Sequence, residues 1–246
     1  MQIVIDDILL NYSFINRKKQ STIVILHGWG RTYKEWVPIG ERLSQDYNIL
    51  FLDLPGFGGS SIPENEHFGM NQYQATVEKF IKKMKLKNLT LIGHSFGGKI
   101  SIMIASKLDR VEHLILINSS GVDEKNMVTN LKIWLARKLK PLTFFLSENS
   151  RETLLKTLAS SDYPGTEQFR KIFKSIINRD VVKEAKIIKC KTLIVWGEKD
   201  KEVSISSTKK IKTLISGSIL RIVWGAGHDP HLTHPEKLLL LLKEYL

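Results

Sequence analysis

The chain has only one cysteine, Cys190, which cannot form an intramolecular disulfide and offers no thiolate cluster for a metal. Long apolar runs are also missing: the run from Leu238 to Leu242 ends at a lysine on either side, whereas a bilayer span needs about 20 apolar residues. Asp6 and Asp7 stand where a signal peptide would carry lysine or arginine. These absences predict a cytoplasmic protein without a transmembrane segment.

Negative charge is comparatively scarce. The 246 residues include 37 Lys and Arg against 25 Asp and Glu, a net charge of +12. Such a surplus can indicate nucleic acid, an anionic membrane or an acidic protein partner, or only solvated lysines on helix faces. No nucleic-acid-binding motif accompanies the charge, so we expect no nucleic acid partner. An apolar share of 42% excludes a disordered chain.

Short apolar runs alternate with stretches of helical periodicity, which predicts an α/β fold. The expected strands are residues 2–5, 9–15, 22–26, 48–53, 89–92, 113–118, 192–196 and 220–224, and the expected helices are residues 35–45, 72–85, 97–108, 205–215 and 235–245. Most of these strands are apolar throughout, as in a mostly parallel eight-stranded sheet covered by helices on both faces. The first two strands are joined too closely for a crossover, so we expect an antiparallel hairpin at one edge.

One region departs from this alternation. Residues 122–188 show no convincing strand, only helical segments separated by Pro141, Asn149 and the 163–165 turn. We therefore expect a core made of residues 1–121 and 189–246, with a helical cap inserted at 122–188.

The strongest motif is Gly-His-Ser-Phe-Gly-Gly at residues 93–98, directly after an expected strand and at the start of an expected helix. It matches the G-x-S-x-G pattern in the strand–turn–helix context that this pattern requires. A sharp turn strains the backbone and leaves no room for side chains beside the serine, which accounts for the glycines. Ser95 is therefore the candidate nucleophile, with the N-terminus of a helix beneath it.

A serine nucleophile needs a base and a carboxylate that orients the base. In folds that carry the serine on such a strand–turn–helix motif, the acid follows the serine in the chain and the histidine comes last. Asp200 and His228 follow Ser95 in this order. Both lie just after expected parallel strands, whose carboxyl ends meet at one edge of a sheet. Glu198 and Asp123 are the competing candidates for the acid. Asp200 and His228 could each also be an ordinary solvated loop residue without a catalytic role.

A site for the developing oxyanion is the third requirement. His-Gly-Trp-Gly at residues 27–30 follows the strand expected at 22–26. Its backbone would lie near Ser95 if the two strands are neighbours. We expect the N–H groups of Trp29 and Phe96 to form the oxyanion hole, with Gly28 as the alternative loop donor.

These motifs, together with Asp-Leu-Pro-Gly-Phe-Gly-Gly-Ser at residues 53–60, resemble the α/β-hydrolase superfamily from about residue 3 to residue 246. Members that attack with a carboxylate, such as haloalkane dehalogenases and epoxide hydrolases, do not fit because Ser95 stands at the nucleophile position. The resemblance implies a serine carboxylesterase-like enzyme, similar to those that cleave pimeloyl-carrier-protein methyl ester. Such an enzyme would cleave an ester or thioester through an acyl-serine intermediate, which is then hydrolysed by water that His228 activates.

Two other functions stay open. Carbon–carbon bond hydrolases of meta-cleavage products share the triad, but their elbow often has asparagine before the serine and their first loop is richer in glycine. His94 and Arg31 therefore favour the esterases. A ligand-binding protein of the same fold with slow turnover is the second alternative.

The remaining signals give weaker expectations. The glycines of residues 56–59 open a loop rather than a helix, which argues against a dinucleotide cofactor. His228, His231 and His234 are spaced by three, but prolines interrupt any helix that would align them, so we expect no metal.

The expected cap bears on substrate and partner. The aromatic residues that we expect to line the substrate pocket are Trp29, Trp134, Phe144 and Phe145. Residues 132–140 form a basic amphipathic segment, either a solvated face or a docking surface for an acidic acyl carrier protein or an anionic substrate.

Overall fold

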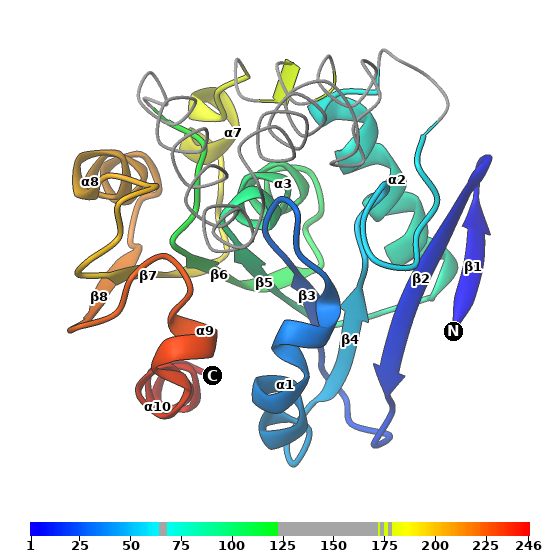
Figure 1. Ribbon diagram of the computed structural model, residues 1–246, viewed down its shortest axis with the longest axis horizontal. Helices are drawn as coiled ribbons and strands as arrows, with labels where there is room; N and C mark the ends of the chain where they lie inside the picture. Colours follow the sequence, from blue (N-terminus) through cyan, green and yellow to red (C-terminus); the bar gives the residue numbers. More distant parts are fainter. Residues whose placement is uncertain (64–67, 123–171, 173–174, 177–178) are drawn as a thin grey trace, which may run out of the picture.

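The computed structural model describes residues 1–63, 68–122, 172, 175–176 and 179–246 (Figure 1). Its strands are β1 (Gln2–Ile5), β2 (Ile8–Ile15), β3 (Thr22–Leu26), β4 (Asn48–Leu52), β5 (Leu89–His94), β6 (Val111–Ile117), β7 (Lys191–Gly197) and β8 (Ile219–Val223). They form one eight-stranded sheet in the order β1-β2-β4-β3-β5-β6-β7-β8. The pairs β1–β2 and β2–β4 are antiparallel and the other neighbours are parallel, which confirms the expected sheet and its edge hairpin.

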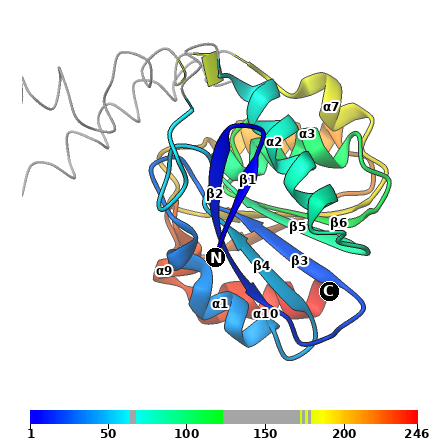
Figure 2. The same ribbon diagram turned by 90° about the vertical axis from the view of Figure 1, so that its right-hand side faces the viewer.

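Helices cover both faces of this sheet. They are the 3₁₀ helix η1 (Tyr33–Trp36) and the α-helices α1 (Val37–Leu43), α2 (Met70–Lys83), α3 (Phe96–Ala105), α7 (Val182–Lys186), α8 (Ile205–Leu214), α9 (Pro230–Thr233) and α10 (Pro235–Tyr245). In Figures 1 and 2, α2, α3 and α7 lie on one side of the sheet, and α1, α9 and α10 lie on the other. Figure 1 also places α8 on the side of α3.

The two layers explain why the central strands are apolar without alternation. Along β3, Val24 and Leu26 pack into the core on the side of α2 and α3, while Ile23 and Ile25 pack into the core beneath α1 and α10. Successive side chains of a strand point to opposite faces, and both faces here are buried.

Some element boundaries differ from the expected ones. The helix expected at 35–45 is a 3₁₀ turn followed by α1, which has a proline in its first turn. Proline fits the first turn of a helix because the N–H that it lacks would have no partner inside the helix. The short helix α9, just after His228, was not expected.

The parallel strands bring distant segments to one edge. In register, Leu26 of β3 lies beside Gly93 of β5, and Ile117 of β6 lies beside Val195 of β7. The segments that follow these strands therefore start side by side at the carboxyl edge of the sheet, where open α/β sheets bind ligands.

Most of the cap expected at 122–188 lies outside the described residues, so its division from the core stays a prediction. Helix α7, near its end, packs against α3 and α8. Over the parts of the chain described above, none of the helices combines the length and the apolar character needed to cross a bilayer.

Candidate active site

Ser95 occupies a strained turn between β5 and α3. Its backbone has φ 50° and ψ −110°, in the half of the map that residues with side chains rarely adopt. Hydrogen bonds hold this conformation: the Ser95 N–H donates to Ile117 O (3.0 Å), and Ser95 O accepts from the N–H groups of Gly98 (3.1 Å) and Ser120 (3.2 Å). The turn is therefore fixed between the end of β6 and the first turn of α3.

Two glycines allow this turn to pack closely. A Cβ atom on Gly97 would lie 2.2 Å from the carbonyl oxygen of Leu26, and a Cβ atom on Gly93 would lie 2.5 Å from Cα of Gly98. Helix α3 thus begins against the backbone of β3 and β5, as the glycine pattern of the motif indicates.

Asp200 and His228 are in contact across the loops that follow β7 and β8. Nδ1 of His228 lies 2.9 Å from Oδ2 of Asp200. The other carboxylate oxygen, Oδ1, accepts from the backbone N–H groups of Glu202 (2.7 Å) and Val203 (3.1 Å). Burial would raise the pKa of Asp200, but His228 and these donors outweigh it and hold the pKa below its ordinary value. Asp200 is therefore an ionised, fully oriented partner of the imidazole.

Of the two competing acids, Glu198 is described and bonds elsewhere. The carboxylate of Glu198 accepts from the backbone N–H of Gly225 (2.9 Å) and so braces the loop after β8. Asp123 lies outside the described residues.

Asn118, directly after β6, also bonds to Asp200, a role that its sequence context did not predict. Its side-chain N–H donates to Oδ2 of Asp200 and to Gly227 O (3.3 Å), and its Oδ1 accepts from the Gly197 N–H (3.2 Å). It is buried at φ 45°, a left-handed conformation that asparagine tolerates better than most residues. The sequence feature that could have indicated this role is a polar amide side chain at the end of an otherwise apolar central strand.

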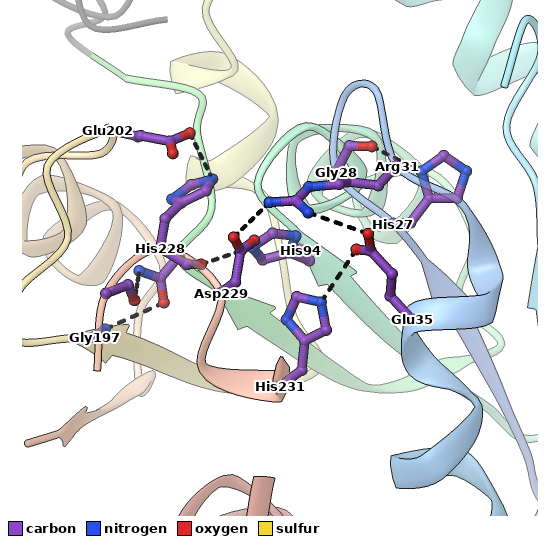
Figure 3. A network of polar contacts seen from close by, with 12 residues as sticks. His27, Gly28, Arg31, Glu35, His94, Gly197, Glu202, His228, Asp229 and His231 are labelled. Carbon is purple, nitrogen blue, oxygen red and sulfur yellow. Dashed lines mark hydrogen bonds and ion pairs between the residues drawn. The ribbon is translucent and has the colours of Figure 1, made fainter. Parts of the chain in front are cut away.

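The second ring nitrogen of His228 faces another carboxylate. Nε2 lies 3.3 Å from Oε2 of Glu202 (Figure 3), and within the described residues no hydrogen bond joins it to the Ser95 hydroxyl. Burial would lower the pKa of His228, but the nearby carboxylates, chiefly Asp200, outweigh it and raise the pKa to about 9.

His94 links the serine turn to the histidine loop. Its Nε2 lies 2.9 Å from the carbonyl oxygen of His228, and the two rings are 4.9 Å apart between centroids. Because a carbonyl oxygen only accepts, this nitrogen carries the proton. Burial holds the pKa of His94 well below its ordinary value, so the ring is neutral. The residue that precedes Ser95 thus holds the backbone of His228 beside the turn.

A buried ion pair joins the loop after β3 to the same histidine loop. The Arg31 guanidinium lies 2.5 Å from Asp229 Oδ2 and 3.1 Å from Glu35 Oε1 (Figure 3). Burial would lower the pKa of Arg31, but the two carboxylates raise it. His231 stacks on Trp36 with ring centroids 4.1 Å apart. These contacts hold the loop after β3 and the loop after β8 together beside η1.

The loop at residues 27–30 lies against the serine turn. A Cβ atom on Gly28 would be 3.5 Å from Ser95 Cβ. The carbonyl oxygen of Gly28 accepts from Nδ1 of His27 (2.7 Å) and from the Arg31 N–H (3.2 Å). In a trans peptide the following N–H, that of Trp29, points the opposite way from this carbonyl. The orientation of the Gly28–Trp29 peptide is therefore set by its hydrogen bonds.

Aromatic side chains gather beside the turn. The Trp29 ring packs edge-to-face on Phe57 (4.8 Å) and Phe96 (5.3 Å). The other three residues expected to line a pocket lie outside the described residues: Trp134, Phe144 and Phe145.

The segment 53–60 forms a turn that supports the loop. Asp53 accepts from the N–H groups of Tyr33 (2.8 Å) and Gly59 (2.9 Å) and from the Asn11 amide (2.7 Å). These hydrogen bonds tie the turn to β2 and to the start of η1, so Asp53 has a structural role in this part of the fold.

One group of side chains has the composition of a metal site. Ligand atoms of His94, Asp229 and His231 lie within 4.8 Å of one another. The Arg31 guanidinium already neutralises Asp229, and a cation would have to displace it. We therefore assign no metal to this group.

Comparison with known proteins identifies the family. A family model described as the alpha/beta hydrolase fold matches residues 21–235, and the chain belongs to this family. The 2-hydroxy-6-oxo-2,4-heptadienoate hydrolase of Pseudomonas putida is 24% identical over 91% of this chain and 88% of that protein. Lipase 1 of Psychrobacter immobilis is 25% identical over 85% of this chain and 71% of that protein.

A solved structure supports the same fold. The esterase EaEST from Exiguobacterium antarcticum matches with a TM-score of 0.77 at 20% identity, over 98% of this chain and 96% of that one.

Proposed function

We propose that this protein is a serine hydrolase that cleaves a carboxylic ester or thioester. Ser95 acts as nucleophile, His228 as general base and then general acid, and Asp200 orients the imidazole. The observation that carries the proposal is the 2.9 Å contact between Asp200 and His228, assembled beside the strained turn at Ser95.

The reaction would proceed through an acyl-serine. The Ser95 hydroxyl oxygen adds to the substrate carbonyl carbon as its proton passes to Nε2 of His228. Collapse of the tetrahedral intermediate breaks the bond to the alcohol or thiol, which leaves with the proton from Nε2. Water then adds to the acyl carbon as its proton passes to Nε2. Collapse of this second intermediate breaks the bond to Ser95 Oγ, which takes the proton back from Nε2 as the carboxylic acid leaves. Asp200 accepts the hydrogen bond from Nδ1–H of His228 throughout and stabilises the imidazolium in each step.

The oxyanion would be bound by two backbone N–H groups, those of Trp29 and Phe96. The fixed Gly28–Trp29 peptide and the position of Phe96 at the first turn of α3 support this assignment. One such donor contributes about 3 kcal/mol to transition-state stabilisation. None of these steps requires a metal or an organic cofactor.

Active-site labelling tests the proposal. A fluorophosphonate should label the wild-type protein and leave Ser95→Ala unlabelled. Ser106→Ala, directly after the last residue of α3, is the matched control and should label normally. Labelling that persists in Ser95→Ala would refute the assignment. A panel of p-nitrophenyl esters of rising chain length would then define the acyl group.

Cleavage of a carbon–carbon bond on the same triad is the second candidate, favoured by the similarity to the heptadienoate hydrolase of Pseudomonas putida. Turnover of a dienoic ketoacid well above that of every p-nitrophenyl ester would establish it. A burst of one equivalent followed by a near-zero rate would instead indicate a slow-turnover binding protein.

The basic segment 132–140 lies outside the described residues, so docking of an acidic acyl carrier protein or an anionic substrate stays a prediction. If such docking occurs, kcat/KM for that substrate should fall steeply with ionic strength. A flat salt response would exclude it.

A further inference from the structure

Glu202 lies in the loop after β7, two residues beyond Asp200, and contacts the His228 ring from the side opposite Asp200. Its backbone N–H donates to Oδ1 of Asp200, while its side chain turns toward His228 (Figure 3). Oε2 lies 3.3 Å from Nε2, and the two side chains are only 19% and 9% exposed. The imidazole is therefore held between two carboxylates.

Counting protons shows what this contact requires. Nδ1 of His228 faces the ionised carboxylate of Asp200, so Nδ1 carries a hydrogen. If Nε2 and Glu202 were both deprotonated, two lone pairs would face each other at 3.3 Å. The contact is therefore favourable when one of the two groups carries a proton, on Nε2 as part of an imidazolium or on the Glu202 carboxyl. In both cases the Nε2 lone pair is not open to the Ser95 hydroxyl.

We propose that Glu202 is a positioning residue that holds the Nε2 proton of His228 in the resting enzyme, and that His228 becomes a base toward Ser95 only when this pair opens. The inference rests on the proposed hydrolase function and adds a control of the proton at the same site.

The charges around the ring favour the imidazolium form. Besides Asp200 and Glu202, Asp229 adds a third negative charge from the histidine's own loop, and together the three carboxylates raise the pKa of His228 to about 9 against the effect of burial. Burial, with the neighbouring carboxylates, raises the pKa of Glu202, which the imidazolium opposes.

Two described groups face these side chains from other elements; one opposes the carboxylates and the other adds no charge. Arg31, after β3, faces Asp229 and neutralises much of its charge. His94, on β5, is neutral because burial lowers its pKa, so it adds no charge beside His228. Among the described residues, Glu202 contacts Nε2 and, unlike Asp229, forms no ion pair with a guanidinium.

The pair should limit activity at neutral pH. With a His228 pKa of about 9, only about 1% of the ring is neutral at pH 7. An opposite charge within about 4–6 Å shifts a pKa by about 1–3 units. Removing the Glu202 charge should therefore enlarge the neutral fraction about tenfold for each unit by which the pKa falls.

The test compares Glu202→Gln with Glu198→Gln. Glu198 lies in the same loop, is exposed, and braces Gly225 rather than the ring, so it controls for the loss of one charge. The His228 ring is titrated by NMR, with His228→Gln to assign its signal. The pH dependence of kcat/KM is measured on a p-nitrophenyl ester.

For Glu202→Gln we expect the NMR pKa of His228 and the acid limb of kcat/KM to move down together by about 1–3 pH units, and kcat/KM at pH 7 to rise at least about tenfold. Glu198→Gln should match the wild type. If Glu202→Gln does not fold, Glu202→Asp, with a shorter reach to Nε2, should show a smaller shift in the same direction.

The outcomes separate this inference from the proposed function. An unchanged NMR pKa in the Glu202 variants overturns the inference, whatever the activity. A lowered NMR pKa in a protein without hydrolase activity supports the pair and refutes the proposed function. A raised acid limb also overturns the inference, because it would show that Glu202 helps to deprotonate the ring.

Discussion

The pH dependence of stability offers a test of the charge environment of His228 that does not depend on activity. Its pKa rises from 6.5 in the unfolded chain to about 9 in the fold, so the folded state binds more protons between these values. Stability from this group is fully present below pH 6.5 and is lost as the pH rises through 9. At about 1.36 kcal/mol per unit, the free energy of unfolding should fall by about 3 kcal/mol across this window.

Other buried histidines do not mask this effect. Burial lowers the pKa of His27, His94 and His231, so they are neutral in both states above pH 6.5. Below pH 6.5 they act with the opposite sign, because the unfolded chain binds their protons more readily. Stability should therefore be greatest near pH 6.5.

Urea unfolding at steps from pH 6.5 to 9 would measure this slope, with His228→Gln as the control. The glutamine side chain can still donate to Asp200 but does not titrate, so its curve should be nearly flat in this window. A flat wild-type curve, or the same slope in both proteins, would refute the argument that three carboxylates hold His228 as a cation.

Two further substitutions test how the site is built. Gly97→Ala would place a Cβ atom 2.2 Å from Leu26 O, so we expect a loss of about 1–3 kcal/mol of stability in urea unfolding; an unchanged midpoint would contradict this packing. Asn118→Ala removes one donor to Asp200 and leaves the Gly197 N–H without its side-chain acceptor. A hydrogen bond to a charged group contributes about 1.5–3 kcal/mol, so kcat should fall about ten- to hundredfold with KM little changed; a loss confined to KM would contradict an orienting role.

Much of the fold could be predicted from local patterns. The apolar runs located all eight strands to within a few residues. The signal is clearest for β3, β4 and β5, which are buried along their whole length and so must be apolar on both faces. The 3₁₀ helix η1 and the short helix α9 were not predicted, because a single turn is too short to show periodicity. The motif at 93–98 predicted the turn at Ser95 because only glycines fit beside it.

The side-chain contacts around the candidate active site could not be predicted from the sequence, because they join residues far apart in the chain. Asn118 and Asp200 are 82 residues apart, and Arg31 and Asp229 are 198 residues apart. The sequence indicates some of these residues singly, such as Asp200 after its strand, but no local pattern indicates which residue each one contacts. The carboxylate of Glu202 could not be assigned to the ring from its place in the chain, because Lys201 and Glu198 beside it look equally solvated.

The sequence alone determined the order of strands and helices, the serine at a glycine-flanked turn, and an acid and a histidine after the right strands, because these depend on periodicity and on the size of single residues. Only the tertiary structure decided which carboxylates meet the imidazole and which nitrogen each one faces. Protonation depends on distances of a few ångströms between side chains from separate loops, and on the burial that strengthens their charges. No local stretch of chain encodes either quantity.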